Sequence, residues 1–218
     1  MSEHERGERS VPEVCSTSGV LILVRHGRTD LNARGLLQGR IDHSLDEVGC
    51  AQAAELAKVL GRPDRVISSP LVRARETAAA FGCPVEVDER WIELDYGELD
   101  GHPVASVGAD VWARWRSDLT FTPAGGESIH VMVQRVVQAC DGLIAEARHQ
   151  DIVVVSHVSP IKAAVTWALG VGAEAGWRTH LDAASITRVD CRANGPLLRT
   201  FNETGHLGEV LGPVRITG

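Results

Sequence analysis

The chain has 218 residues, and its hydrophobic fraction of 44% and charged fraction of 23% are those of a globular protein long enough to bury its own core. The formal net charge of -7 argues against a general affinity for nucleic acid, which needs clustered lysine and arginine. No apolar run approaches the length of a membrane span. We therefore expect no nucleic-acid partner and no membrane partner, and an anionic ligand would need a local basic pocket.

The cysteines and the first residues of the chain indicate in which cellular compartment the protein is expected. Five cysteines are scattered, odd in number and without Cys-x-x-Cys spacing, which predicts neither a disulfide framework nor a zinc site. We expect reduced thiols and a cytoplasmic location. Residues 1–18 are polar and lack the apolar core of a signal peptide, so they predict a flexible tail ahead of a single domain over 19–218.

An unbroken aliphatic run at 20–24 ends abruptly in Arg25-His26-Gly27. A run without alternation is typical of a strand buried on both faces in a parallel sheet, where functional residues gather beyond the carboxyl ends of the strands. A core strand could also end in these residues by chance. Arg25 and His26 are therefore candidates that need partners elsewhere in the chain.

A helix is predicted from Ser44, because Ser44 and Glu47 have the spacing of a capping box, and Gly61 is expected to end it. The run at 65–68 predicts a short strand. Ser69 and Pro70 follow and have the residue types of an N-cap and a first helical position.

That next helix would carry Arg73 and Arg75 in its first turns. Cations there oppose the helix dipole unless an anion is bound nearby, although a solvated arginine on an exposed face is an equally simple interpretation. Side chains two residues apart on a helix do not face each other. Only one of the two arginines should therefore reach a pocket.

A short strand is predicted at 84–87, followed by a loop at 91–97 that contains Glu93 between large apolar residues. Such surroundings disfavour the charged carboxylate and raise its pKa, as an acid catalyst requires, although a surface glutamate in a turn is the alternative. Residues 98–126 are rich in glycine and proline and predict a helical excursion over the pocket. Its Trp112 and Trp115 could simply be core residues.

The rest of the chain predicts regular structure. An amphipathic helix is expected from 127 to 144, and a second buried strand at 152–156 ends at His157, with Ser159-Pro160 expected to open another helix. A lone histidine at such a place is more often structural. Two strand-like runs, 183–189 and 196–201, complete the pattern.

Basic residues therefore follow three predicted strands, at Arg25-His26, at 69–73 and at His157. Parallel strands would bring these junctions to one edge of the sheet. The chain has neither a Walker lysine motif nor a Gly-x-Gly-x-x-Gly motif, so this edge favours a small phosphate bound mainly by side chains.

Five separated motifs, in this order, make the chain similar to a known family, the histidine phosphatase superfamily with its phosphoglycerate mutase-like fold. The similarity runs from about residue 20 to 207 and implies a three-layer α/β/α sandwich with a mostly parallel central sheet. The motifs are Arg25-His26-Gly27, Ser69-Pro70-Leu71-Val72-Arg73-Ala74, Glu93 within Glu-x-x-Tyr-Gly, Gly125-Gly126-Glu127-Ser128, and Ser156-His157.

The resemblance implies a role for each matching residue. It implies His26 as the nucleophile, Arg25 and Arg73 as phosphate clamps, His157 as the second pocket histidine and Glu93 as the proton donor. Further candidates for substrate binding are Arg28, Thr29, Asn32, Gln38, Gly39, Tyr96 and Val158. Two of these depart from the family pattern, because Arg28 stands where Glu or Gln is common and Val158 replaces the usual glycine.

The resemblance implies a metal-independent phosphatase, without a cofactor, that hydrolyses a small-molecule phosphomonoester through a phosphohistidine. The closest similarity is to actinobacterial members named acid or α-ribazole phosphatases, and a homodimer stays open. We expect a protonated His157 to help the arginines neutralise the phosphate, and the second ring nitrogen of His26 to donate to a backbone carbonyl.

Two alternatives remain. One is a 2,3-bisphosphoglycerate-dependent phosphoglycerate mutase, and the other is a phosphate-binding regulatory module without turnover. The brief connection from Trp115 to Gly125 favours hydrolysis, because a mutase must shield its phosphohistidine from water. The presence of both a nucleophile and an acid argues against the regulatory module.

Overall fold

The computed structural model describes residues 19–211. The predicted tail at 1–18 lies outside the described residues, as does the end of the predicted domain, so these two assignments stay predictions. The described chain is built on one six-stranded sheet of order β3-β2-β4-β1-β5-β6. None of the helices in this part of the chain is both long and apolar enough to cross a membrane.

The first four strands in that order run parallel, which confirms the mostly parallel sheet. They are β3 (Val85–Val87), β2 (Arg65–Ser68), β4 (Ile152–Ser156) and β1 (Leu21–Arg25). A hairpin completes the other side, where β5 (Ile186–Arg192) pairs antiparallel with β1, and β6 (Gly195–Glu203) pairs antiparallel with β5.

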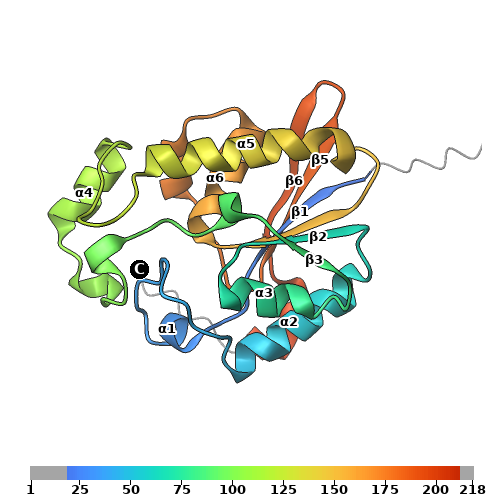
Figure 1. Ribbon diagram of the computed structural model, residues 1–218, viewed down its shortest axis with the longest axis horizontal. Helices are drawn as coiled ribbons and strands as arrows, with labels where there is room; N and C mark the ends of the chain where they lie inside the picture. The colour runs from blue at the N-terminus through green and yellow to red at the C-terminus, as the bar shows by residue number, and fades with distance from the viewer. Residues whose placement is uncertain (1–18, 212–218) are drawn as a thin grey trace, which may run out of the picture.

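Helices cover both faces of the sheet, so the three-layer sandwich is confirmed (Figure 1). One face packs against α5 (Ile129–Ala147) and α6 (Val158–Leu169), and the other against α2 (Glu47–Leu60) and α3 (Val72–Ala79). Successive strand residues point to opposite faces. Leu21 and Leu23 of β1 therefore join the core on the α5 side, whereas Ile22 and Val24 join the core on the α2 side.

The helix starts predicted from capping residues were each wrong by two positions. The N-cap of α2 is Asp46 rather than Ser44, and its Oδ1 accepts from the Gly49 amide at 2.7 Å. Both residue types cap well, and Asp46 is also fixed by its ion pair with Arg28.

The two helices that follow pocket strands also begin elsewhere than predicted. α3 begins at Val72, two residues beyond Pro70, with Leu71 as its N-cap, and the Ser69 hydroxyl instead contacts His157 Nε2 and accepts from the Leu71 amide at 3.3 Å. α6 begins at Val158 with His157 as its N-cap, so Ser159 lies inside the first turn.

The irregular segment forms the predicted helical excursion beyond the end of α5, at the left of Figure 1. It contains short 3-10 turns and α4 (Ala109–Ser117), and its Trp115 is a core residue. Its two ends meet, because the Glu98 amide donates to the Ala124 carbonyl at 3.0 Å. Gly97, at φ 57°, lies so close to Ala124 that a Cβ there would collide with it, which gives a physical reason for glycine at this neck.

Three short elements complete the fold around the sheet. α1 (Asp30–Ala33) follows the β1 loop, a 3-10 segment (Ala173–Arg178) follows α6, and another (Gly205–Leu211) packs on the α2 side.

Candidate active site

The two pocket histidines are side by side because of the sheet register. Arg25 pairs with Ser156 across the parallel β1 and β4, so His26 and His157 follow at the same level, with ring centroids 5.1 Å apart. Ser68 of β2 pairs with Val155, which brings Ser69 to the same edge. The prediction that the three strand-to-helix junctions meet is therefore confirmed.

Arg73 lies between the two histidines. Its Nε is 3.2 Å from His26 Nε2 and 3.2 Å from His157 Nδ1, and its two terminal nitrogens donate to the Gly39 and Ile41 carbonyls at 2.7 and 2.9 Å. Burial lowers the pKa of Arg73 to about 10, so it is a cation at neutral pH. Arg75 is exposed, as expected if only one arginine reaches the pocket.

These contacts define the protonation of both imidazoles. An arginine Nε can only donate, so His26 Nε2 and His157 Nδ1 must accept. His26 Nδ1 then donates to the Gly27 carbonyl at 2.7 Å, the kind of backbone acceptor that the sequence led us to expect. His157 Nε2 donates to Ser69 Oγ at 2.6 Å.

Both histidines are therefore neutral in this structure, and the protonated His157 that we expect beside a bound phosphate stays a prediction. Burial, followed by the charge of Arg73, holds the pKa of each imidazole well below its usual value. The sequence suggested a cationic histidine because of its expected phosphate partner. Beside two guanidinium groups and without an anion, the neutral form is the stable one.

Among the buried donors that face no acceptor within residues 19–211, two belong to residues predicted for the site. They are Arg25 Nε and Gln38 Nε2. Another nitrogen of Arg25 donates to the Leu181 carbonyl at 2.6 Å, and Thr29 donates its hydroxyl to Gln38 Oε1 at 2.8 Å, so both side chains are held in place. Buried donors are normally satisfied, and these two fit an anion bound beside the histidines.

Glu93 is buried at the N-terminus of α6, with 3% of its surface exposed. Its carboxylate accepts from the Leu94 amide at 2.7 Å and from the Ser159 amide at 3.2 Å. These bonds favour the ionised form, but burial is the larger effect and raises the pKa of Glu93. Glu93 is thus suited to hold a proton at a pH where an exposed glutamate would not.

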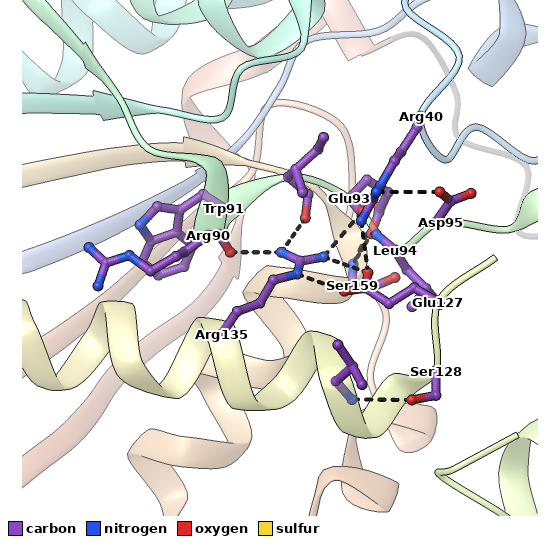
Figure 2. A network of polar contacts seen from close by, with 12 residues as sticks. Arg40, Arg90, Trp91, Glu93, Leu94, Asp95, Glu127, Ser128, Arg135 and Ser159 are labelled. Carbon is purple, nitrogen blue, oxygen red and sulfur yellow. Dashed lines mark hydrogen bonds and ion pairs between the residues drawn. The ribbon is translucent and has the colours of Figure 1, made fainter. Parts of the chain in front are cut away.

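Arg135 of α5 fixes the backbone that carries Glu93 (Figure 2). It donates to the Arg90 and Ile92 carbonyls, each at 2.7 Å, and to the Glu93 carbonyl at 3.2 Å. The same guanidinium forms a two-pronged pair with Glu127, at 3.0 and 2.9 Å. Because three carbonyls of one loop meet a single rigid fork, Arg135 restricts the position of Glu93.

The other predicted binding residues divide into two groups. Tyr96 and Val158 line a cavity next to Glu93. Arg28 instead pairs with Asp46 at 2.7 Å, and Asn32 forms a reciprocal capping box with Thr29 at the start of α1. These contacts give Arg28 and Asn32 structural partners, and none of them involves the histidine pair.

Sequence reasoning missed three residues that shape the site. Ser69 and Glu127 belong to recognised motifs but had no assigned role. Arg135 had no local signal, since its partners lie 8 to 45 residues away along the chain. Within residues 19–211, no group of three or more His, Cys, Asp and Glu side chains could hold a metal ion, and metal independence stays a prediction.

Comparison with known proteins decides the family. The profile of the histidine phosphatase superfamily, branch 1, matches residues 21–204. The chain belongs to the histidine phosphatase superfamily. The resemblance inferred from the five motifs is thus confirmed.

Similar members of this superfamily have different names. The chain is 36% identical over 198 residues to a bifunctional protein of Mycobacterium tuberculosis, covering 86% of the chain and 54% of that relative. The chain therefore spans about half the length of the first mycobacterial relatives it matches. It is 35% identical over 205 residues to phosphoserine phosphatase 1 of Hydrogenobacter thermophilus, covering 87% of the chain and 94% of the relative.

A solved structure shows the same fold. A variant phosphoserine phosphatase of Entamoeba histolytica, in complex with phosphoserine, superposes with a TM-score of 0.79 at 31% identity. The match covers 86% of this chain and 98% of the other. Membership of the superfamily and these phosphatase relatives support phosphomonoester hydrolysis.

Proposed function

We propose that this protein is a metal-independent phosphatase that hydrolyses a small phosphomonoester through a phosphohistidine on His26. The observation that carries the proposal is the state of His26, a neutral imidazole whose Nδ1 proton is held by the Gly27 carbonyl while Nε2 presents its lone pair to Arg73. A nucleophilic imidazole needs that tautomer.

The phosphate would lie between the basic groups. Arg25 Nε and Gln38 Nε2 supply donors that lack acceptors, and the Nε proton of Arg73 turns from the histidines to a phosphate oxygen. This change frees His26 Nε2 for attack. A bound dianion beside His157 raises the pKa of that imidazole, so a protonated His157 belongs to the complex rather than to the unliganded site.

The proposed reaction has two chemical steps, formation of the phosphohistidine and its hydrolysis. In the first, His26 Nε2 forms a bond to phosphorus, the bond from phosphorus to the ester oxygen breaks, and Glu93 gives its proton to the leaving alkoxide. In the second, the Glu93 carboxylate takes a proton from water as the water oxygen attacks phosphorus. The phosphorus–nitrogen bond then breaks and returns its electron pair to His26, and inorganic phosphate leaves.

The test is to trap the intermediate. Wild-type protein quenched during turnover should carry acid-labile, base-stable phosphate on His26, and His26→Ala should lose both the label and turnover. Phosphate found on serine, or full activity in His26→Ala, would overturn the mechanism. Dialysis against EDTA should leave the rate unchanged, whereas a rate restored only by added metal would contradict a pocket made of side chains.

The same preparation separates hydrolysis from mutase activity. With 3-phosphoglycerate and a trace of 2,3-bisphosphoglycerate, we expect any turnover to release free phosphate. Rapid formation of 2-phosphoglycerate with little phosphate released would replace the proposal by the mutase alternative. A cytoplasmic location also stays a proposal, supported by Cys50, Cys83, Cys140 and Cys191, which are free thiols in the described chain.

A further inference from the structure

A cavity of about 220 Å³ opens next to Glu93. Leu94, Val158 and Ser159 form the part of its wall nearest the reacting groups. Leu94 and Val158 directly follow Glu93 and His157, and the Ser159 amide donates to the Glu93 carboxylate at 3.2 Å. The cavity therefore begins where a leaving alcohol would take its proton from Glu93.

The cavity wall is mainly aromatic and aliphatic. Trp112 is central to it, with its ring centroid 5.4 Å from Trp115 and 6.1 Å from Trp177. Met132 and Val133 of α5 and Val158 of α6 add aliphatic surface. Trp115 is fully buried, whereas Trp112 and Trp177 are half-buried and still have ring surface to offer a ligand.

Polar groups on this wall are few. Lys162 is the cation among the lining residues, and its Nζ already donates to the Thr179 carbonyl at 2.7 Å. The Tyr96 hydroxyl lies 3.4 Å from Ser159 Oγ. A small charged leaving group such as serine would lose hydration against tryptophan and methionine with little in return, whereas an apolar group would gain by leaving water.

We infer that the leaving group of the substrate is a bulky, mainly apolar alcohol whose ring or hydrocarbon part packs against Trp112 and Trp177. This inference rests on the proposed function, because it assigns the cavity to the alcohol that Glu93 protonates. Such a leaving group differs from that of phosphoserine, the ligand of the related phosphoserine phosphatase, because the alcohol in phosphoserine is the small, charged amino acid serine.

A homologous ester series tests the inference. Ethyl, 2-phenylethyl and 2-(1-naphthyl)ethyl phosphate release primary alcohols of similar acidity, so each ester makes a similar demand on Glu93. From ethyl to naphthylethyl phosphate we expect kcat/KM to rise on the order of 100-fold, as two rings become buried. Binding of the matching non-hydrolysable phosphonates should follow the same order.

Matched tryptophan variants connect that preference to the cavity. Trp177→Ala and Trp112→Ala should each reduce the ratio of kcat/KM for naphthylethyl phosphate to that for ethyl phosphate about 10-fold. The control is Trp167→Ala, because Trp167 lies on α6, donates its indole N–H to Asp141 at 2.9 Å and does not line the cavity. That variant should keep the wild-type ratio. Two cavity variants are used so that the ratio can still be measured if one of them fails to fold.

The outcomes separate this inference from the proposed function. Equal hydrolysis of all three esters, or an unchanged ratio in both cavity variants, would overturn the inference while the phosphatase proposal stands. If no ester releases phosphate, the proposed function fails, and phosphonate binding then decides the cavity alone. Tighter binding of the naphthyl compound would support the apolar assignment, and equal binding would overturn it.

Discussion

The two halves of this site are built in different ways. The phosphate half comes from the ends of three adjacent parallel strands, and its side chains are held by backbone carbonyls and by one another, as with Arg73 on Gly39 and Ile41. The cavity beside it is formed by residues of the excursion, α5, α6 and the 3-10 segment after α6. Its walls are held by side-chain packing.

This difference suggests that the two halves of the site have different roles in the reaction. Hydrogen bonds between strands fix the ends of β1, β2 and β4 within one sheet, so the reacting groups cannot shift independently. The excursion is closed at its neck by Gly97 and Ala124, and beyond the neck it is joined to the rest of the fold by a few backbone hydrogen bonds, such as that from the Leu37 amide to the His102 carbonyl, rather than by a strand of the sheet. Changes in the phosphate half should therefore affect every substrate, and changes in the cavity should affect only the choice among substrates.

The largest expected effect lies in the phosphate half. Arg73→Ala should lose on the order of 2 kcal/mol or more of transition-state stabilisation with every ester of a panel, because the buried guanidinium meets the phosphate common to all of them. Arg75→Ala, an exposed residue of the same helix, is the control and should cost little. The measurement is kcat/KM across the panel, with thermal melting to confirm folding.

Two results would contradict this comparison. Equal losses in the two arginine variants would mean that Arg73 has no special role. A loss in Arg73→Ala that depends on the leaving group would mean that the two halves are not separable.

The next effect concerns Glu93, at the boundary of the two halves. Glu93→Gln keeps the shape but cannot give a proton, so in a single turnover the phosphohistidine should form from alkyl esters about 100-fold more slowly, whereas its formation from p-nitrophenyl phosphate, whose leaving group needs no proton, should change little. A uniform loss with both ester types would refute the role as proton donor.

The pH dependence of the rate provides a second test of the acid role with the same Glu93→Gln variant. Burial raises the pKa of Glu93, so its acid form persists to higher pH than in an exposed glutamate and is lost as pH rises through that raised pKa. The advantage of the wild type over Glu93→Gln in the single-turnover rate of phosphohistidine formation from alkyl esters should therefore be greatest at low pH and decline with rising pH. Taking the ratio of the two enzymes cancels the ionisation of the substrate. An advantage that grows with pH would have the wrong sign for an acid.

The smallest expected effect tests whether Arg135 positions Glu93. Arg135→Met should slow single-turnover formation of the phosphohistidine from alkyl esters by about 10-fold, because the Glu93 backbone loses its support, and should leave its formation from p-nitrophenyl phosphate nearly unaffected. Arg90→Met is the matched control, since Arg90 pairs with Asp88 through its side chain at the surface. A purely structural role for Arg135 would lower the rate with both ester types alike, and that result would sink the positioning role.

Much of the fold followed from local sequence. The aliphatic runs at 20–24 and 152–156 are buried strands because they are apolar on both faces, and the residues that follow such strands must emerge at the sheet edge. For that reason His26, Arg73 and His157 could be placed in one pocket from the sequence alone. The burial of Glu93 also followed from its apolar neighbours.

Tertiary structure decided what local sequence could not. The contact between Ser69 and His157 joins residues 88 positions apart, and the neutral state of His157 depended on the guanidinium beside it, so both required the completed pocket. Arg135 could reach the Glu93 loop only after α5 had docked. The cavity depended on Trp112 and Trp177 meeting across 65 residues of chain. Sequence patterns report the environment of neighbouring residues, whereas charge states and cavity walls arise from side chains that only folding brings together.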